Sequence, residues 1–502
     1  MSRANMADAA TRVDLSLISH TNAGKTTLAR TLLTRDVGEV RDAPHVTGQA
    51  EPYTLIETPE GDVLRLWDTP GFGDSARLAK RLQQHGNPIG WFLSEVWDRW
   101  RDRPFWSSQQ AIRNVREQAD AVLYLVNASE APADAGYVAP ELQILKWIGK
   151  PAIALLNQMG QPRERGFEDA EEARWQQVLG EHAFIQTVLP LDAFARCWVQ
   201  ELTLLRAVGI AVPETKRSAF ARLTAAWQAR RQDQFAAAMN ALAVQVASAA
   251  CDRDALTATG LRATLRDVGK AIGFTRDGEE SAKERAMRAL ADRLDIEIRA
   301  STDRLISVHG LEGRAAGEVL ARMATSFTSD EPVSEGTAAV LGGFMTGAVS
   351  GLAADLAAGG ITFGAGLLTG GVLGALGAAG LARGFNLMRG SKETTVRWSD
   401  EFLDGLVQAA LLRYLAVAHY GRGRGEWSAS EHPPFWKHAV AAVLESRRVP
   451  LAAIWARRGE HCDSANLIAA LQDFLAGAAT ELLENLYPQA RPRTIVAPAP
   501  TV

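Results

Sequence analysis

The sequence predicts an α/β domain, with a mostly parallel sheet and helices on both faces, followed by a mainly α-helical domain. From about Val13 to Pro190, short apolar runs alternate with helical stretches, as in a parallel sheet covered by helices. The first run leads through a glycine-containing loop directly into a helical stretch. From about Thr203 alanine, arginine, glutamine and glutamate dominate, apolar residues recur at intervals of three and four, and prolines are almost absent.

Six runs have the length and apolar character of strands in the first domain. They span residues 13–19, 53–57, 63–68, 121–127, 152–157 and 184–189. We expect this domain to cover residues 10–200. At 502 residues the chain is too long for one hydrophobic core, so further domains must follow.

An insertion at about residues 74–118 contains Trp91, Trp97, Trp100 and Trp106 among arginines and aspartates. Two interpretations fit this composition. Binding surfaces are enriched in tryptophan and arginine, which favours an interface. An amphipathic helix that packs its tryptophans against the rest of the protein has the same pattern.

The remaining chain divides into four parts by composition. These are a helical domain, a Gly/Ala-rich segment, a second helical region and a proline-rich tail that we expect to be disordered, at residues 201–335, 336–390, 391–488 and 489–502. Within the second part, residues 336–382 carry one charge, Asp355, and have the length of two helices. Small residues at intervals of four allow such helices to pack closely.

This helical hairpin has two possible environments. Each helix is long enough to cross a membrane, and Arg383, Arg389 and Lys392 could anchor one end. Against this, alanine and glycine are weakly hydrophobic, and an aspartate such as Asp355 costs about 2.5–3.5 kcal/mol on insertion scales. A tightly packed hairpin within a soluble protein is the alternative.

Charge and cysteine content limit the location and partners of the protein. The net charge of −4 gives no overall attraction to phosphate backbones, so nucleic acid is not an expected partner. Cys197, Cys251 and Cys462 lie far apart in no ligand spacing, which indicates a reducing compartment and no disulfide framework. The N-terminus lacks the apolar core of a signal peptide. We expect a cytoplasmic protein, associated with the inner membrane if residues 336–382 insert.

The loop after the first strand has the composition of a phosphate site. It reads Ser19-His-Thr-Asn-Ala-Gly24-Lys25-Thr26-Thr27 and fits the pattern GxxxxGK[ST], except that Ser19 replaces the first glycine. Backbone N–H groups and a helix N-terminus would surround the β-phosphate. Lys25 would neutralise β- and γ-phosphate oxygens, and Thr26 would hold Mg²⁺.

A second element appears where the third strand ends, in Asp68-Thr-Pro-Gly71. An aspartate at this strand end can hold the water shell of Mg²⁺, and the Gly71 N–H can contact the γ-phosphate and respond to its loss. The tetrad alone is a weak signal, but it is strong at this distance after a phosphate loop. Together the two elements predict a nucleoside triphosphate switch.

These motifs resemble the Era-like GTPases of the translation-factor class over about residues 12–192. In that family an Asp-x-Pro turn precedes a threonine that binds Mg²⁺ and the γ-phosphate, and here Asp42-Ala-Pro44 leads to Thr47, 22 residues after Lys25. The arrangement of the whole chain resembles a bacterial family in which such a domain precedes an uncharacterised helical domain. The resemblance implies GTP and GDP as ligands, with Mg²⁺ and, in some members, K⁺.

The resemblance assigns roles to particular residues. It implies catalytic roles for Lys25, Thr47 and Gly71, and metal binding by Thr26, Thr47 and Asp68. The residues implied in nucleotide binding are Asn22, Ala23, Gly24, Lys25, Thr26, Thr27, Asn157, Gln158 and Asp192.

Two departures from the family pattern concern specificity and turnover. The base-reading motif Asn-Lys-x-Asp is here Asn157-Gln-Met-Gly160, so the carboxylate that reads guanine is missing. Phe72 occupies the position of a water-orienting glutamine, and its ring cannot hydrogen-bond to water. Asn22 stands where some relatives use an asparagine to help bind K⁺, although a polar loop residue can also simply satisfy its own backbone.

We therefore expect a GTP-binding protein that hydrolyses GTP slowly and acts as a nucleotide-dependent switch, located at a membrane if residues 336–382 insert. One alternative is a nucleotide-binding scaffold with little turnover or relaxed base specificity. A ribosome-assembly GTPase is another, because many relatives have that role, although the tail carries no basic RNA-binding module.

Overall fold

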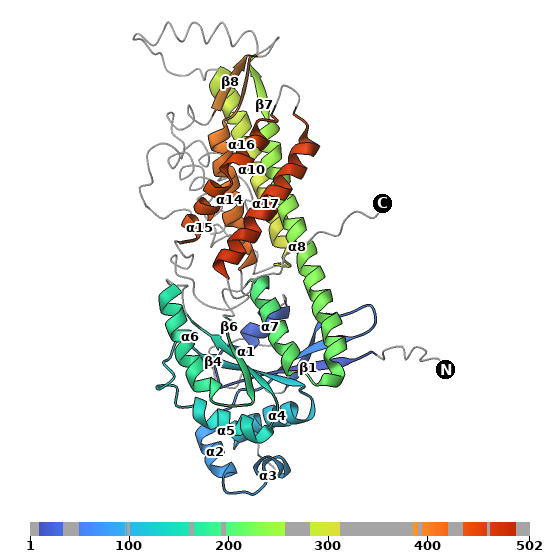
Figure 1. Ribbon diagram of the computed structural model, residues 1–502, viewed down its shortest axis with the longest axis vertical. Coiled ribbons are helices and arrows are strands. Elements are labelled where there is room, and N and C mark those ends of the chain that lie inside the picture. Colours follow the sequence, from blue (N-terminus) through green and yellow to red (C-terminus); the bar gives the residue numbers. More distant parts are fainter. Residues whose placement is uncertain are drawn as a thin grey trace, which may run out of the picture. The chain divides into compact units, whose positions relative to one another are not determined.

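The computed structural model describes eleven segments of the chain. They are residues 10–33, 50–95, 97, 101–159, 165–191, 197–256, 282–311, 385–389, 394–419, 435–458 and 462–487. The chain divides into two compact units (Figure 1). The first comprises residues 1–232, 418–427 and 487–502, and the second comprises residues 233–417 and 428–486.

The first unit contains a six-stranded sheet in the order β2-β3-β1-β4-β5-β6. The strands are β1 (Arg12–Ser19), β2 (Glu51–Glu57), β3 (Val63–Asp68), β4 (Ala121–Asn127), β5 (Ala152–Asn157) and β6 (Ile185–Pro190). All neighbouring pairs are parallel except β2 and β3. The carboxyl ends of β1, β3, β4, β5 and β6 therefore lie at one edge of the sheet, where ligands of open α/β sheets bind.

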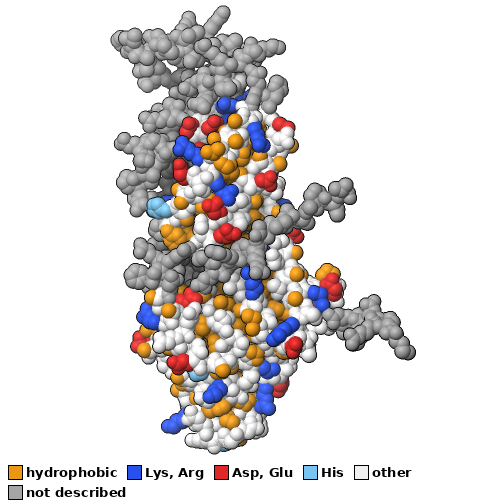
Figure 2. Space-filling view, viewed as in Figure 1, with side chains coloured by type: hydrophobic (Ala, Val, Ile, Leu, Met, Phe, Trp, Pro, Cys, Tyr) orange, Lys and Arg blue, Asp and Glu red, His pale blue; other side chains and the backbone are white. Residues whose placement is uncertain are grey.

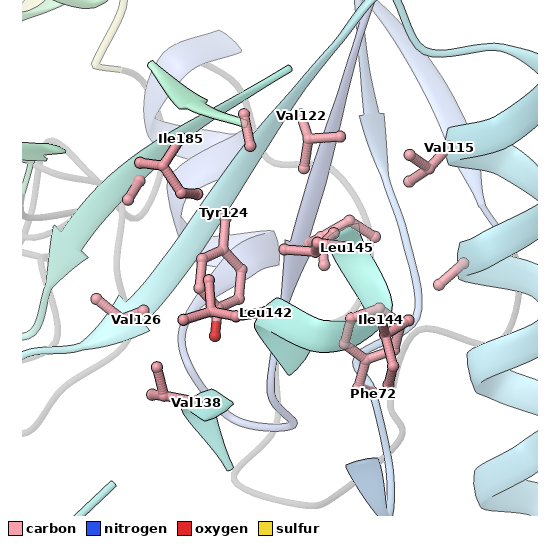
Figure 3. Packing of buried hydrophobic residues seen from close by; sticks show 14 of the residues in the cluster. Phe72, Val115, Val122, Tyr124, Val126, Val138, Leu142, Ile144, Leu145 and Ile185 are labelled. Atoms are coloured by element: carbon pink, nitrogen blue, oxygen red, sulfur yellow. The ribbon is translucent and has the colours of Figure 1, made fainter. Parts of the chain in front are cut away.

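Each strand predicted from the sequence is present, and three of the six, β1, β2 and β6, differ from the prediction by one or two residues at an end. The central strands β4 and β5 are buried almost throughout, because helices cover both faces of a parallel sheet. Figure 3 shows alternate β4 residues, Val122, Tyr124 and Val126, directed toward Leu142 and Leu145 of the helix that follows.

Helices of the first unit fill the connections between strands. They are α1 (Lys25–Leu33), α2 (Ser75–Leu82), α3 (Pro88–Ser94), α4 (Arg103–Glu117), α5 (Val138–Ile148), α6 (Arg165–Gly180) and α7 (Trp198–Ala211). Residues of α2 to α6 share one hydrophobic cluster with one face of the sheet. The boundary expected at residue 200 falls within α7, and the unit continues into the long helix α8 (Arg217–Cys251) as far as Gln232.

The tryptophan-rich insertion packs against its own domain. Trp91 and Trp97 are partly buried against the hydrophobic cluster. The guanidinium of Arg81 lies 5.9 Å from the Trp91 ring centroid and 4.9 Å from that of Trp97. The packing interpretation of these two tryptophans is therefore confirmed, and Trp100 lies outside the described residues.

The second unit combines helices with a small antiparallel sheet. Its helices besides α8 are α10 (Ala282–Val308), α14 (Asp400–Ala418), α15 (Phe435–Ser446), α16 (Arg448–Trp455) and α17 (Ser464–Leu486). The sheet has the order β7-β9-β8, with strands β7 (Arg253–Leu256), β8 (Phe385–Arg389) and β9 (Thr394–Trp398).

This small sheet corrects two of the predicted boundaries. We expected residues 201–335 to be helical and residues 336–390 to be a hydrophobic hairpin, but β7 lies within the first range and β8 ends the second. Residues 394–398 form β9, although helices were expected directly after Lys392. Each strand is short. β7 pairs with β9, about 140 positions later in the chain, whereas β8 and β9 are close in sequence.

A disulfide joins Cys251, at the end of α8, to Cys462, just before α17. The prediction that cysteine spacing excludes such a link was wrong, because cysteines separated by 211 positions in sequence are here neighbours in space, with their Cα atoms 5.5 Å apart. Cys197 is buried and lies outside this disulfide.

The glycine-rich residues 336–382 and the tail at 489–502 lie outside the described residues. Among those described, one helical stretch, Glu214–Cys251, has the length and hydropathy of a membrane span. More than half of its apolar window, 56%, is buried inside the protein, as in the core helix of a globular domain. This helix also buries Arg231, which forms a 2.8 Å ion pair with Glu201 of α7.

Charged side chains of both signs are interspersed on the described part of the face in Figure 2. This agrees with a net charge of only −4 for the chain.

Candidate nucleotide-binding site

The loop between β1 and α1 has the backbone shape of an anion-binding turn. Asn22 and Gly24 have positive φ angles of 67° and 88°, and α1 begins directly afterwards at Lys25. Left-handed residues of this kind turn backbone N–H groups inward, and the helix N-terminus adds a partial positive charge. The predicted strand, loop and helix are thus present in the predicted order.

Gly24 is required at its position for two reasons. Its φ of 88° is one that residues with a Cβ rarely adopt, and a Cβ built there would lie 2.6 Å from Asn157 Nδ2. The Asn157 amide, buried at the end of β5, donates a 2.8 Å hydrogen bond to the Ala23 carbonyl. The base-reading segment therefore fixes the phosphate loop, as the sequence predicted for Asn157.

The Lys25 ammonium is buried within the loop that it follows. Its Nζ donates to Ser19 Oγ at 2.9 Å and to the His20 carbonyl at 3.4 Å. Burial lowers the pKa of this ammonium, and the carboxylates of Asp68 and Glu141 oppose that shift. The serine that replaces the first glycine of the motif thus has a role of its own, because its hydroxyl holds the lysine.

Thr26 and Asp68 bring the two motifs together. Thr26 Oγ1 donates to Asp68 Oδ2 at 2.6 Å, and Asp68 is 1% exposed at the end of β3. Burial raises the pKa of Asp68 to about 6, against the opposing effects of the Thr26 hydrogen bond and of Lys25. Its second oxygen, Oδ1, is buried and has no hydrogen-bond partner in the described part of the chain.

This pair fits a hydrated Mg²⁺. The ion prefers a hydroxyl and a carboxylate with several retained waters, and the unpartnered Asp68 Oδ1 supplies an acceptor for such a water. No cluster of three or more histidine, cysteine, aspartate or glutamate side chains occurs among the described residues, so a metal site made only of protein ligands is not found there.

Gly71 lies directly against the phosphate loop. A Cβ at this residue would lie 2.9 Å from Lys25 Nζ and 3.0 Å from Thr21 Cα. The next residue, Phe72, donates its N–H to the Ser19 carbonyl at 2.9 Å, and its own carbonyl accepts from the Thr21 N–H at 3.2 Å. A γ-phosphate bound in the loop would therefore lie near Gly71, and the contact with its N–H remains a prediction.

Phe72 turns away from the loop into the hydrophobic core. Its ring is fully buried and packs beside Ile144 of α5 (Figure 3). The buried Phe72 ring cannot orient a water, which agrees with the prediction from sequence.

Two other predicted contacts can be placed. Gln158 has a φ of 59°, and its Nε2 donates to the Asn22 carbonyl at 3.4 Å. Asn22 itself is exposed on the loop, whereas Thr27 is buried in the first turn of α1. Thr47, Gly160 and Asp192 lie outside the described residues, so their predicted roles remain predictions.

The sequence reasoning missed three side chains behind the loop. His20 Nδ1 lies 3.0 Å from Glu141 Oε1, and the hydroxyl of Tyr124 donates to Glu141 Oε2 at 3.0 Å. The available signal was the helical position of Glu141, which shares one face of α5 with Val138 and Leu142. An acid on the apolar face of a helix is rarely buried without a partner.

These features define the class of the first unit: a P-loop domain of the GTPase type, with an Asp-x-x-Gly segment held against the loop. Residues 14–158 match the family described as "50S ribosome-binding GTPase", which confirms the class predicted from the motifs. Residues 182–486, more than half of the chain, match the family described as "Domain of unknown function (DUF3482)". The protein therefore belongs to the DUF3482 family.

Solved structures similar to the chain include two of Era and one of another GTP-binding protein. Era in complex with MgGDPNP and nucleotides 1506–1542 of 16S ribosomal RNA is 16% identical, with a TM-score of 0.31 over 41% of this chain and 58% of Era. Era of Aquifex aeolicus bound to GDP and AlF4⁻ is 18% identical, with a TM-score of 0.29 over the same shares.

A GTP-binding protein of Sulfolobus solfataricus in complex with GDP is 15% identical, with a TM-score of 0.23 over 42% of this chain and 52% of that protein. The chain thus spans less than two thirds of the length of each of these proteins. No curated protein matches the chain in sequence.

Proposed function

We propose that the protein binds GTP and GDP together with Mg²⁺, hydrolyses GTP slowly, and uses the bound nucleotide as a switch. One observation carries the proposal. The Thr26 hydroxyl and the Asp68 carboxylate meet at 2.6 Å beside the buried Lys25, so the groups for Mg²⁺ and for the phosphates converge on one point. The match of residues 14–158 to a GTPase family supports the choice of nucleotide.

Each group has a defined task in this proposal. Lys25 neutralises phosphate oxygens, and the N-terminus of α1 supplies a favourable dipole. Bound Mg²⁺, held by Thr26 and through water by Asp68, would neutralise further phosphate charge. The Gly71 N–H would contact the γ-phosphate and lose that contact after hydrolysis, which would release α2.

Calorimetry with the full-length protein tests nucleotide binding. We expect GDP and a non-hydrolysable GTP analogue to bind in the presence of Mg²⁺, and Lys25→Ala to lose tight binding because the phosphates lose a buried ammonium. Lys146→Ala is the matched control, since this lysine is exposed on α5. Unchanged affinity in Lys25→Ala would show that the phosphates bind elsewhere.

A scaffold with little turnover is the second candidate, and the burial of Phe72 favours it. Turnover of GTP measured with Mg²⁺ and K⁺ separates the two functions. A hydrolysis rate no higher than that of GTP in buffer would leave binding as the sole function.

Base preference belongs to the same experiment, because Gly160 supplies no carboxylate to guanine. We expect GTP to be preferred over ATP by less than the several orders of magnitude that a complete polar site gives.

Location at the inner membrane is part of the proposal and depends only on the composition of residues 336–382. Flotation of the full-length protein with liposomes tests it, with a variant lacking these residues as the control. We expect the deletion to abolish flotation while GDP affinity stays the same. Full-length protein that never floats would favour the alternative of a packed hairpin.

A further inference from the structure

His20, the first residue of the phosphate loop, belongs to a cluster behind that loop. Its imidazole stacks on Tyr137, with ring centroids 4.6 Å apart and planes inclined by 21°. Its Nδ1 lies 3.0 Å from Glu141 Oε1, and Tyr124 binds the other oxygen of that carboxylate. The His20 side chain is one-third exposed, whereas the Glu141 side chain is completely buried.

The titratable groups of this cluster come from several elements. Glu141 belongs to α5, Tyr137 directly precedes that helix, Tyr124 belongs to β4 and Lys25 to α1, and Asp68 at the end of β3 acts on Lys25. Burial raises the pKa of Glu141, and only His20, Tyr124 and Lys25 oppose that shift. A buried carboxylate is strongly destabilising unless a cation or several donors compensate it. The Lys25 ammonium interacts with both Asp68 and Glu141. Its single positive charge cannot compensate the charges of both carboxylates and of the phosphates.

We propose that His20 is a positioning residue of the phosphate site whose ion pair with Glu141, formed on protonation, strengthens nucleotide binding. The inference rests on the proposed nucleotide-binding function. An imidazolium cancels the Glu141 charge, leaves Lys25 free to act on the phosphates and adds positive charge at the loop. With a neutral imidazole, the Glu141 carboxylate retains its hydrogen bonds, but its negative charge is then compensated by Lys25 alone among these groups.

The direction of the pH dependence follows from linkage. Phosphate binding favours the protonated imidazole, so protonation must favour phosphate binding by the same free energy. Affinity for GDP therefore falls as pH rises and the imidazole loses its proton. Asp68, whose pKa is about 6, and the terminal phosphate of GDP also titrate near neutral pH. Comparison of variants at equal pH cancels their contributions.

The test is calorimetric titration of the full-length protein with GDP and Mg²⁺ between pH 6 and pH 8.5, in pairs of buffers with different ionisation enthalpies. The informative variants are His20→Asn, which places an amide nitrogen at the position of Nδ1 without a titrating charge, and Glu141→Gln. His182→Asn is the matched control, because this partly exposed histidine precedes β6 at the opposite end of the sheet.

We expect the unmodified protein and His182→Asn to take up more protons on binding GDP near pH 7 than His20→Asn does. His20→Asn should bind GDP about fivefold more weakly than the unmodified protein at pH 6. At pH 8.5 the two proteins should bind GDP equally well. Glu141→Gln should have a flatter pH profile and bind at least as tightly as the unmodified protein at pH 8.5, because it removes a negative charge near the phosphates.

A purely structural role gives a different result. If His20 and Glu141 only brace the loop, both variants should weaken binding by the same factor at every pH, and parallel profiles would overturn the inference alone. Absence of GDP binding by the unmodified protein at every pH would overturn the proposed function, and this inference with it.

Discussion

The hydroxyl of Thr26 donates a 2.6 Å hydrogen bond to the carboxylate of Asp68, and this single contact joins the first turn of α1 to the end of β3. The two residues are 42 positions apart in sequence and belong to different motifs. Their meeting turns two short sequence patterns into one site, with an unpartnered carboxylate oxygen directed into it.

Asp68→Asn should stabilise the nucleotide-free protein while removing its Mg²⁺ dependence. The pKa of Asp68 is raised to about 6 from 3.8, so the ionised form destabilises the fold at neutral pH. This contribution disappears as pH falls through 6 toward 4, because the folded protein then binds the proton more strongly than the unfolded chain.

Two pKa units correspond to about 3 kcal/mol, and we expect a smaller gain because Lys25 loses a partner. The thermal midpoint at pH 7.5 should rise by a few degrees, and GDP affinity should become the same with Mg²⁺ and with EDTA. A lower thermal midpoint for Asp68→Asn, together with a GDP affinity that still depends on Mg²⁺, would contradict the assignment of Asp68 to the Mg²⁺ site.

Gly24→Ala should abolish GDP binding, because its Cβ would displace the Asn157 amide that fixes the loop. Gly149→Ala is a matched control: this residue has a similar φ of 75°, but a Cβ there meets nothing within 4 Å. Both variants store the backbone strain of a left-handed alanine, about 1–2 kcal/mol. Chemical denaturation should show that the two variants lose comparable amounts of folding stability from that strain. Calorimetry should show loss of GDP binding in Gly24→Ala only. Equal GDP affinity in the two variants would argue against the fitted loop.

Hydrolysis in K⁺ should exceed hydrolysis in Na⁺ if Asn22 helps to seat a monovalent ion beside the phosphates. A fixed cation stabilises the charge that develops in the transition state. Asn22→Ala should remove the difference, whereas Asn466→Ala, near the start of α17, should preserve it. Steady-state phosphate release in matched salts measures this. Equal hydrolysis rates in both salts for the unmodified protein would indicate that Asn22 only hydrogen-bonds to its own loop backbone.

Exchange of GDP for a GTP analogue should change the fluorescence of Trp97. The helix α2 begins four residues after Gly71, and its Arg81 guanidinium lies over the Trp97 ring at 4.9 Å. Movement of α2 with the γ-phosphate would alter this cation–π contact. Trp97→Phe should remove most of the signal, and Trp175→Phe, a buried residue of α6, should leave it. An unchanged spectrum on exchange would indicate that α2 does not respond to nucleotide.

The first domain could be predicted from sequence because its signals are local. Strands such as residues 152–157 are uninterrupted apolar runs, and the residues around Lys25 and Asp68 lie in short patterns whose chemistry demands their spacing. The small sheet of the second unit was missed because β7 pairs with a strand about 140 positions later and is too short to give a periodic signal.

The same limit applies to the site. His20 and Glu141 are separated by 121 positions, and no local pattern joins a loop histidine to one particular acid of α5. Ser19 was interpreted as a missing glycine, although its hydroxyl holds Lys25. Contacts between distant segments depend on the packing of the sheet and its helices, which short motifs do not encode.

Cys251→Ser should lower the stability of the second unit. Closing 211 residues of chain by a disulfide reduces the entropy of the unfolded state, and the loop-closure relation gives up to about 5 kcal/mol for such a length. Calorimetric scans with and without a reducing agent should show a lower transition for the reduced protein and for the variant. Cys197→Ser, at the buried cysteine outside the disulfide, should remain sensitive to the reducing agent.

The bond between Cys251 and Cys462 also makes the intervening polypeptide a closed ring. A protease that cuts the backbone once within this ring, at any point, opens it without separating the products. The two fragments would migrate as one species on a non-reducing gel and part only when a thiol is added. A nicked chain would thus keep its phosphate loop covalently attached to α17, and cleavage inside the ring would not by itself release the nucleotide-binding unit from the C-terminal helices.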